Sequence, residues 1–96
     1  YGTSKSALST YMKYAALELA GKGIRCNAVQ PGRINTPLIS NRLLSEEDVT
    51  KDIEQYPMKR YGKPEEVAHA IIYLLSDASA WVTGTNLVID GGRSLK

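Results

Sequence analysis

Apolar residues recur at three- and four-residue spacings along the first twenty positions of the chain, a period that predicts an amphipathic helix. The positions on the shared face are Ala7, Leu8, Tyr11, Met12, Ala15 and Leu19. Tyr14 and Leu17 lie off this face, so the helix is apolar on more than one side. The second apolar side packs either on another subunit or on another part of the same protein, and the two alternatives have equal weight. Gly21 and Gly23 predict the end of the helix.

Two short apolar runs, each bounded by glycine or proline, predict β-strands. The first covers residues 23–30 and ends at Pro31-Gly32, and the second covers residues 86–90 and ends at Gly91-Gly92. Neither run alternates regularly, which is typical of strands that are covered on both faces. Helix, strand, helix and strand follow one another with short connections, so we expect two parallel neighbouring strands in an α/β fold.

The clearest helical pattern begins at Pro64, has Glu65 and Glu66 in its first turn, and ends near Ser76. Its predicted core face comprises Val67, Ala70, Ile71, Leu74 and Leu75. His69 is the only histidine and falls between these positions, so it is predicted to lie on the surface.

The segment after the first predicted strand leaves that strand at its carboxyl end, where ligands bind in open α/β sheets. Gly32 allows the backbone to approach a ligand closely. Thr36 is placed to cap a helix that begins at Pro37, and a ligand contact by its hydroxyl is compatible with that role.

Residues 38–61 carry the weakest pattern. Ser45 begins a predicted short helix that reaches about Gln55, and residues 56–62 read as an irregular connection. Because this segment follows the ligand loop, it is placed where a mobile lid over a substrate would lie. Lys59 and Arg60 form either a solvated basic pair, which is the more frequent case, or a contact to an anionic substrate.

Tyr1 and Lys5 are spaced so that they lie one above the other on a helix. A phenol with a pKa near ~10 is a poor acid or base at neutral pH, and an adjacent ammonium lowers that pKa by favouring the phenolate. The pair can therefore supply a proton donor and acceptor. Alone it is a weak signal, because the chain contains six tyrosines that can match the spacing by chance.

The composition, 43% hydrophobic and 23% charged, is that of a globular protein. A net charge of +2 gives no basis for a nucleic-acid or anionic-membrane partner, and no run reaches the ~18–20 apolar residues of a membrane span. Cys26 is the single cysteine and is predicted to be a small buried residue in a reducing compartment, so we expect a cytoplasmic location. No initiator methionine or cap precedes Tyr1, so we expect a piece of a longer domain.

Taken together, the motifs resemble the C-terminal part of a short-chain dehydrogenase/reductase of the single-domain Rossmann type. The matching motifs are Tyr1-x-x-x-Lys5, Gly23-Ile24-Arg25-x-Asn27-x-Val29-x-Pro31-Gly32, Ile34-x-Thr36-Pro37, Gly62-Lys63-Pro64-Glu65-Glu66-Val67-Ala68, Val82-Thr83-Gly84 and Val88-Ile89-Asp90-Gly91-Gly92. Each motif is weak alone, but together they follow the family order over all 96 residues. In character the sequence is similar to the 3-oxoacyl-acyl-carrier-protein reductases of that family.

The resemblance implies that residues 1–96 are the C-terminal part of one NAD(P)-binding domain with a doubly wound parallel sheet, without its N-terminal dinucleotide-binding half. It implies that Tyr1 is the general acid/base in hydride transfer between nicotinamide and a ketone or secondary alcohol. Lys5 would lower the pKa of Tyr1 and hydrogen-bond the nicotinamide ribose.

The same resemblance implies a cofactor wall after the first strand. Pro31, Gly32 and Ile34 would lie beside the nicotinamide. Main-chain groups near Ile34 and the hydroxyl of Thr36 would hold its carboxamide.

The implied cofactor is NAD or NADP, the substrate is a small carbonyl or alcohol, and the full-length form is a homotetramer. Neither a nucleic acid nor a membrane is implied as a partner. The family's glycine-rich phosphate loop has no match here, so we do not expect the chain alone to bind a dinucleotide. Two alternatives stay open: a catalytically incompetent fragment or oligomerisation piece of such an enzyme, and a non-enzymatic relative with the same fold.

Overall fold

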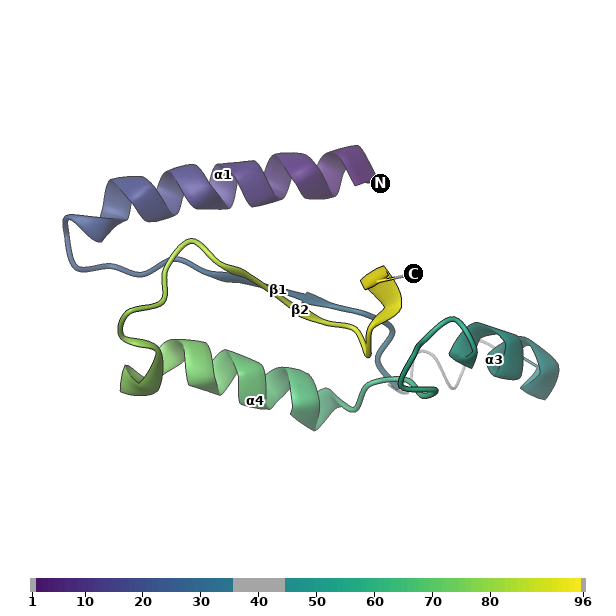
Figure 1. Ribbon diagram of the computed structural model, residues 1–96. Coiled ribbons are helices and arrows are strands. Elements are labelled where there is room, and N and C mark those ends of the chain that lie inside the picture. Colours follow the sequence, from purple (N-terminus) through teal and green to yellow (C-terminus); the bar gives the residue numbers. More distant parts are fainter. Residues whose placement is uncertain (1, 36–44, 96) are drawn as a thin grey trace. The chain divides into compact units, whose positions relative to one another are not determined.

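The computed structural model describes residues 2–35 and 45–95, with side chains from Ser6 onward in the first helix. The elements in chain order are α1 (Gly2–Ala20), β1 (Ala28–Pro31), α3 (Glu46–Ile53), α4 (Pro64–Leu75), a 3₁₀ turn at Asp77–Ser79, β2 (Asn86–Ile89) and a 3₁₀ turn at Arg93–Leu95 (Figure 1). The chain forms two compact units, and each is described by itself. The first contains Tyr1–Val29 and Ile71–Leu87, and the second contains Gln30–Ala70 and Val88–Lys96.

Strands β1 and β2 pair as neighbours in a two-stranded sheet. The Ala28 N–H donates to the Thr85 carbonyl at 2.9 Å, and the Gly32 N–H donates to the Ile89 carbonyl at 2.9 Å. Donor and acceptor both advance by four residues in the same direction, so the strands are parallel. This pairing confirms the α/β class and the parallel neighbours that the order of elements predicts.

The first strand begins later than its apolar run indicates. Residues 23–30 were the predicted strand, whereas β1 starts at Ala28 and includes Pro31. The preceding residues bond to a turn instead: the Cys26 N–H donates to Thr83 Oγ1 at 3.0 Å, and the Gly84 N–H donates to the Cys26 carbonyl at 2.8 Å. Gly84 has a φ of 74°, which turns the partner segment away from an extended conformation and so limits the ladder.

Helix α1 confirms the predicted helix, but its apolar face is only partly buried. Met12 and Ala16 are buried, while Leu8 and Tyr11 of the predicted apolar face are 70% and 76% exposed. Ala16 is in contact with the turn at Gly84, since a Cβ on that glycine would lie 3.6 Å from the Ala16 Cβ. Within the first unit, α1 therefore buries only a short part of its apolar face.

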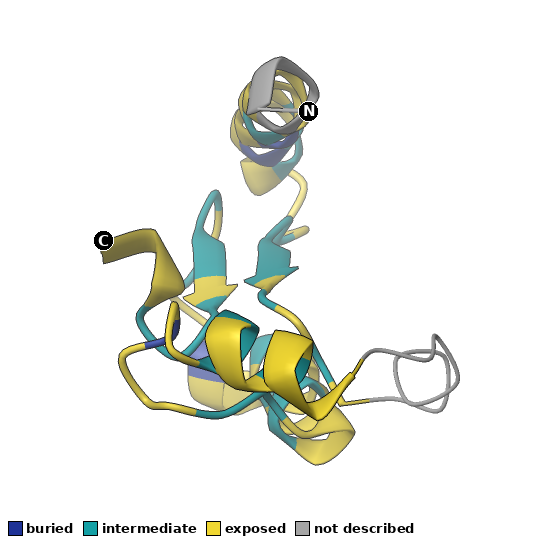
Figure 2. Cartoon of the chain, turned by 90° about the vertical axis from the view of Figure 1, so that its right-hand side faces the viewer, coloured by how far each residue is buried: buried dark blue, intermediate teal, exposed yellow. Residues whose placement is uncertain are grey.

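Burial is also lower than predicted in the strands and in α4. Both strands are mostly half buried rather than covered on both faces (Figure 2). Leu75 is 79% exposed although the pattern places it on the core face, and Cys26 is half buried rather than buried. The described residues offer these side chains too few neighbours to remove them from solvent, so apolar periodicity overestimates burial here. His69 is exposed, as predicted.

The starts of the later helices follow the predicted signals. The Ser45 hydroxyl caps α3 by accepting the Asp48 N–H at 3.1 Å. Helix α4 begins at Pro64, where the missing N–H costs no helical bond. None of the helices within residues 2–35 and 45–95 is both long enough and apolar enough to cross a membrane.

A polar core of the first unit was not foreseen from the sequence. Ser79 is fully buried, and its hydroxyl accepts from Arg25 Nη1 at 2.9 Å. The same guanidinium donates to the carbonyls of Ser76 and Val82. Asn27 donates through Nδ2 to the Val82 carbonyl and accepts the Thr85 N–H through Oδ1, both at 3.0 Å. These bonds hold the chain before β1 against the turn before β2.

Replacing Asn27 by alanine removes both side-chain bonds to this turn. We expect the free energy of unfolding to fall by about 1–3 kcal/mol, because half-buried main-chain groups lose their partner. Urea denaturation measures the change. As a matched control, Asn35→Ala changes an exposed side chain and should stay within about 0.5 kcal/mol of the wild type. Equal stability of the two variants would contradict the role given to Asn27.

Candidate functional site

The loop that follows β1 is held by main-chain bonds to two separate segments of the second unit. The Gly32 N–H donates to Ile89 at the end of β2. The Gly62 N–H donates to the Arg33 carbonyl at 3.0 Å, and the Asn35 N–H donates to the Gly62 carbonyl at 2.8 Å. These last two bonds make a single parallel bridge between Ile34 and Gly62. The loop position is therefore defined on both sides of Ile34.

The bridge does not use the main-chain groups of Ile34 itself. In a parallel bridge the bonds are made by the residues before and after the central one, so the N–H and C=O of Ile34 face away from Gly62. Neither group bonds to another residue in the described part of the chain. A ligand amide offers one donor and one acceptor, so it is complementary to the N–H and C=O of a single residue.

Gly32 lies in a tight space beside Tyr56 and Asp90. A Cβ at this position would lie 3.0 Å from the Asp90 Cβ, 3.1 Å from the Asp90 Cα and 3.2 Å from Tyr56 Cε1. Tyr56 is one of the few buried apolar side chains, and its hydroxyl accepts the Arg33 N–H at 3.2 Å. Sequence reasoning placed Tyr56 in an irregular connection and missed this role, because its partner is 23 positions away.

Asp52 of α3 connects the same loop to the segment before α4. Its Oδ2 accepts from Arg33 Nη1 at 2.7 Å and from the Tyr61 hydroxyl at 2.6 Å. Partial burial raises the pKa of the Tyr61 phenol, and its hydrogen bond to the Asp52 carboxylate raises it further. Tyr61 therefore stays a proton donor to Asp52 at neutral pH. The rings of Tyr56 and Tyr61 meet edge to face, with centroids 6.0 Å apart.

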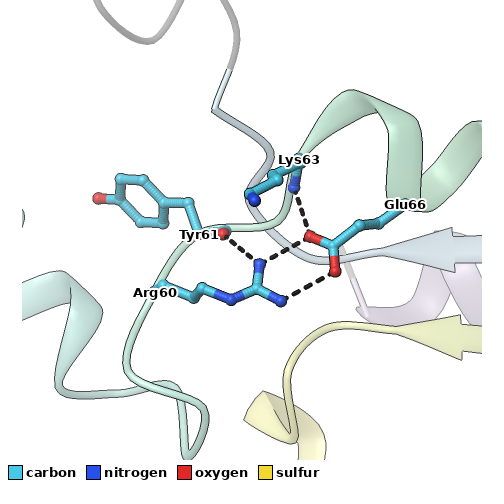
Figure 3. Close-up of polar contacts among 4 residues, drawn as sticks. All are labelled: Arg60, Tyr61, Lys63 and Glu66. Atoms are coloured by element: carbon cyan, nitrogen blue, oxygen red, sulfur yellow. Dashed lines mark hydrogen bonds and ion pairs between the residues drawn. The ribbon is translucent and has the colours of Figure 1, made fainter.

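Arg60 and Glu66 form a second crosslink at the start of α4 (Figure 3). Arg60 Nη1 and Nη2 donate to Glu66 Oε1 and Oε2 at 2.6 and 2.8 Å, and Glu66 Oε1 also accepts the Lys63 N–H at 2.9 Å. The pair with Arg60 and the Lys63 N–H together lower the pKa of Glu66 to about 2. The prediction of a solvated basic pair is wrong for Arg60, because its guanidinium forms an ion pair with Glu66. Lys59 is exposed, and its ammonium donates to the Glu54 carbonyl.

A cavity of about 280 Å³ lies in the second unit beside these residues. Ile34, Tyr56, Met58 and Val88 give it an apolar lining, and Arg33 and Glu66 are among its polar groups. Asp90 also lines it, but its carboxylate already accepts the N–H groups of Gly92 and Ser94. No group of three or more potential metal ligands exists among the described residues.

The predicted site residues divide between what the structure describes and what it does not. Pro31, Gly32 and Ile34 lie together at and after the end of β1 in the second unit. Lys5 lies within α1 in the first unit, but its side chain is outside the description. Tyr1 and Thr36 lie outside the described residues. The structure thus brings the three loop residues together and gives no geometry for the Tyr1–Lys5 pair.

Two parallel strands joined through helices, with a loop at the carboxyl end of the first, are typical of an α/β chain of the Rossmann type. Residues 1–94 match the family described as Enoyl-(Acyl carrier protein) reductase. A solved short-chain type dehydrogenase/reductase from Mycobacterium ulcerans is similar at 38% identity with a TM-score of 0.89, over 100% of this chain and 35% of that one. The chain belongs to the short-chain dehydrogenase/reductase family.

Two other relatives indicate the range of the family. The 3-oxoacyl-[acyl-carrier-protein] reductase of Thermotoga maritima is 46% identical over 92 residues, which cover 96% of this chain and 37% of that protein. The structure of a 4-hydroxyisoleucine dehydrogenase complexed with NADH has a TM-score of 0.89 at 32% identity, over 98% of this chain and 39% of that one. The chain thus spans well under half the length of these relatives.

Replacing Gly32 by alanine forces a Cβ against the backbone of Asp90, which cannot yield as a flexible side chain would. We expect the free energy of unfolding to fall by about 1–3 kcal/mol. Gly21→Ala is the matched control, because a Cβ there has no neighbour within 4 Å. Urea denaturation of both variants tests the prediction, and a Gly32→Ala protein as stable as Gly21→Ala would refute the close approach.

Replacing Glu66 by glutamine should change how stability depends on acid. The pKa of Glu66 falls from its ordinary 4.5 to about 2 on folding, so the unfolded chain takes up the proton first as the pH decreases. Its stabilising contribution is complete above pH 4.5 and is lost as the pH falls toward 2. The Tm of Glu66→Gln, followed by circular dichroism, should therefore fall less steeply across that window than the wild-type Tm.

Glu65→Gln is the control for this acid dependence, since Glu65 is exposed and adjacent to Glu66 on α4. Its Tm should follow the wild-type slope. Identical slopes for Glu66→Gln and the wild type would contradict the assignment.

Proposed function

We propose that residues 1–96 are the C-terminal part of one dinucleotide-binding domain in a longer NAD(P)-dependent oxidoreductase. Its reaction is hydride transfer between nicotinamide and a small ketone or secondary alcohol. The observation that carries the proposal is the Ile34 loop at the carboxyl end of a parallel strand, where the N–H and C=O of Ile34 make no bond to another described residue. The names of the reductase and of the NADH-bound dehydrogenase among its relatives support the same reaction class.

The loop residues fit a nicotinamide by their chemistry. Pro31 and Gly32 have no long side chain, so they can form a flat wall beside a nicotinamide ring. Ile34 adds an apolar side chain to that wall. The N–H and C=O of Ile34 complement a carboxamide, and the Thr36 hydroxyl adds a further polar contact in the proposed site. A ring fixed in this way presents one face to the substrate, which is the orientation that hydride transfer needs. When bound, the nicotinamide supplies or accepts the hydride.

Tyr1 and Lys5 complete the proposed chemistry. The phenol of Tyr1 donates its proton to the substrate oxygen in reduction and takes it back in oxidation. The ammonium of Lys5 favours the phenolate and so lowers the pKa of Tyr1 toward neutral pH. Lys5 also hydrogen-bonds the nicotinamide ribose in this proposal, which places the proton donor next to the cofactor.

The proposal extends to the state of the whole protein. We propose either NAD or NADP as cofactor, a homotetrameric assembly and a cytoplasmic location. The exposed apolar side chains of α1 support an assembly, because Tyr14 and Leu17 are 69% and 78% exposed. Cys26 is a free thiol, which is typical of a reducing compartment.

A second candidate is that this chain serves only folding and oligomerisation, without catalysis of its own. The low burial of its apolar side chains favours this reading for the isolated 96 residues. Calorimetry of NADH and NADPH with the isolated chain and with the longer protein separates the candidates. Binding by the longer protein alone supports the first, and binding by neither supports the second.

Tyr1→Phe in the longer protein tests the acid/base role. We expect kcat to fall by about 10²–10⁴-fold, the usual contribution of a general acid or base, while the Kd of the cofactor stays nearly unchanged. The change in nicotinamide absorbance measures turnover. Tyr14→Phe is the matched control, because it removes an exposed hydroxyl from the same helix and should leave kcat unaltered. A Tyr1→Phe protein that retains most of its turnover would rule out the role.

A further inference from the structure

We propose that Arg33, Asp52 and Tyr61, here called the loop clamp, position the Ile34 loop for the nicotinamide end of the cofactor. The inference rests on the proposed function and adds positioning residues to it. None of the three is among the residues predicted for the site from the sequence.

The geometry of the clamp follows the bridge that it flanks. Arg33 precedes Ile34, and Tyr61 precedes Gly62, so these two residues lie at matching positions of the parallel pair. The same oxygen of Asp52 binds both of them, at 2.7 Å to the guanidinium and 2.6 Å to the phenol. Asp52 thus crosslinks the two segments one residue before the bridge.

The clamp also fixes the direction of the loop. The Arg33 N–H donates to the Tyr56 hydroxyl, while the Arg33 side chain reaches Asp52 of α3. The Arg33 guanidinium carbon lies 6.0 Å from the centre of the Tyr61 ring, within the range of a cation–π contact. Backbone and side chain of Arg33 are therefore held separately, which leaves the adjoining peptide of Ile34 little freedom to rotate.

The clamp contributes little to the free energy of folding, but it fixes the position of the Ile34 loop. The side chains of Arg33 and Asp52 are 43% and 30% exposed, so solvent screens their attraction. A displacement of the loop by about 1 Å is enough to weaken a positioned contact strongly. Loss of the clamp should therefore reduce affinity for the nicotinamide end more than it reduces stability.

The test compares two ligands in the longer protein. Arg33→Ala, Asp52→Ala and the double variant are titrated with NADH or NADPH and, in parallel, with ADP-ribose or its 2′-phosphate, which lack the nicotinamide. We expect the Kd of the reduced cofactor to rise about three- to tenfold in each single variant, with no further rise in the double variant. The Kd of the ADP-ribose ligand should not change. Arg33→Lys, which keeps the charge, should recover part of the affinity.

Glu47→Ala with Lys51→Ala is the matched control. This ion pair lies on the same helix α3, is 3.5 Å long and highly exposed, and joins residues of the helix only. Its removal should leave both dissociation constants unchanged. If the alanine variants of the clamp do not fold, Arg33→Gln and Asp52→Asn remove the charge with less change in size.

Parallel loss of affinity for both ligands, or unchanged affinity for both, would overturn the clamp as a positioning device. Both results differ from a failure of the proposed function. If the proposed function is wrong, the wild-type protein binds neither ligand, and the proposal of the clamp is then refuted together with the proposed function.

Discussion

The main-chain bridge between Ile34 and Gly62 is the constraint on which the candidate site depends. It joins the loop after β1 to the segment before α4, and it does so through the neighbours of Ile34 rather than through Ile34 itself. Fixing a loop costs about 1–2 kcal/mol per residue in backbone entropy, so a defined loop needs several simultaneous contacts. Gly32 supplies one to β2, and Tyr56 supplies another to the Arg33 amide. The result is a residue held in a defined position whose own N–H and C=O make no bond to another described residue.

Two carboxylates reinforce this arrangement in the same way. Asp52 binds Arg33 and Tyr61 with one oxygen, and Glu66 binds Arg60 with both oxygens while it accepts the Lys63 amide. Asp52 joins two segments that are distant in the sequence, and Glu66 joins residues at the start of α4. Each carboxylate therefore restrains the connection at residues 56–62. A connection without regular secondary structure is thereby given a defined path. Ion pairs of this exposure contribute little energy singly, and their role is to specify geometry.

The sequence predicts the features that arise locally and misses those that need a distant partner. The cap at Ser45, the start of α4 at Pro64 and the glycine end of α1 are local, and the structure confirms them. The start of β1 depends on the turn near Gly84, and the roles of Asp52 and Arg60 depend on partners chosen by the fold, so neither could be read from spacing. Asp52 lies in the last turn of α3, and nothing in its sequence spacing indicates its bonds to Arg33 and Tyr61. Sequence motifs indicated Pro31, Gly32 and Ile34 as candidate site residues, whereas no motif indicated that Tyr56 contacts the same loop.

The low burial of apolar side chains bears on whether these 96 residues could be active alone or only within a longer protein. Among the described residues only Met12, Ala16 and Tyr56 are buried apolar side chains, so hydrophobic burial contributes little to the stability of this part alone. The loop is then ordered mainly by half-exposed hydrogen bonds, which water competes for. Covering the exposed apolar side chains of α1 and α4 would add the missing hydrophobic contribution to stability. A loop of fixed geometry therefore needs a larger apolar environment than the described residues supply, and this favours the proposed longer protein over activity by these 96 residues alone.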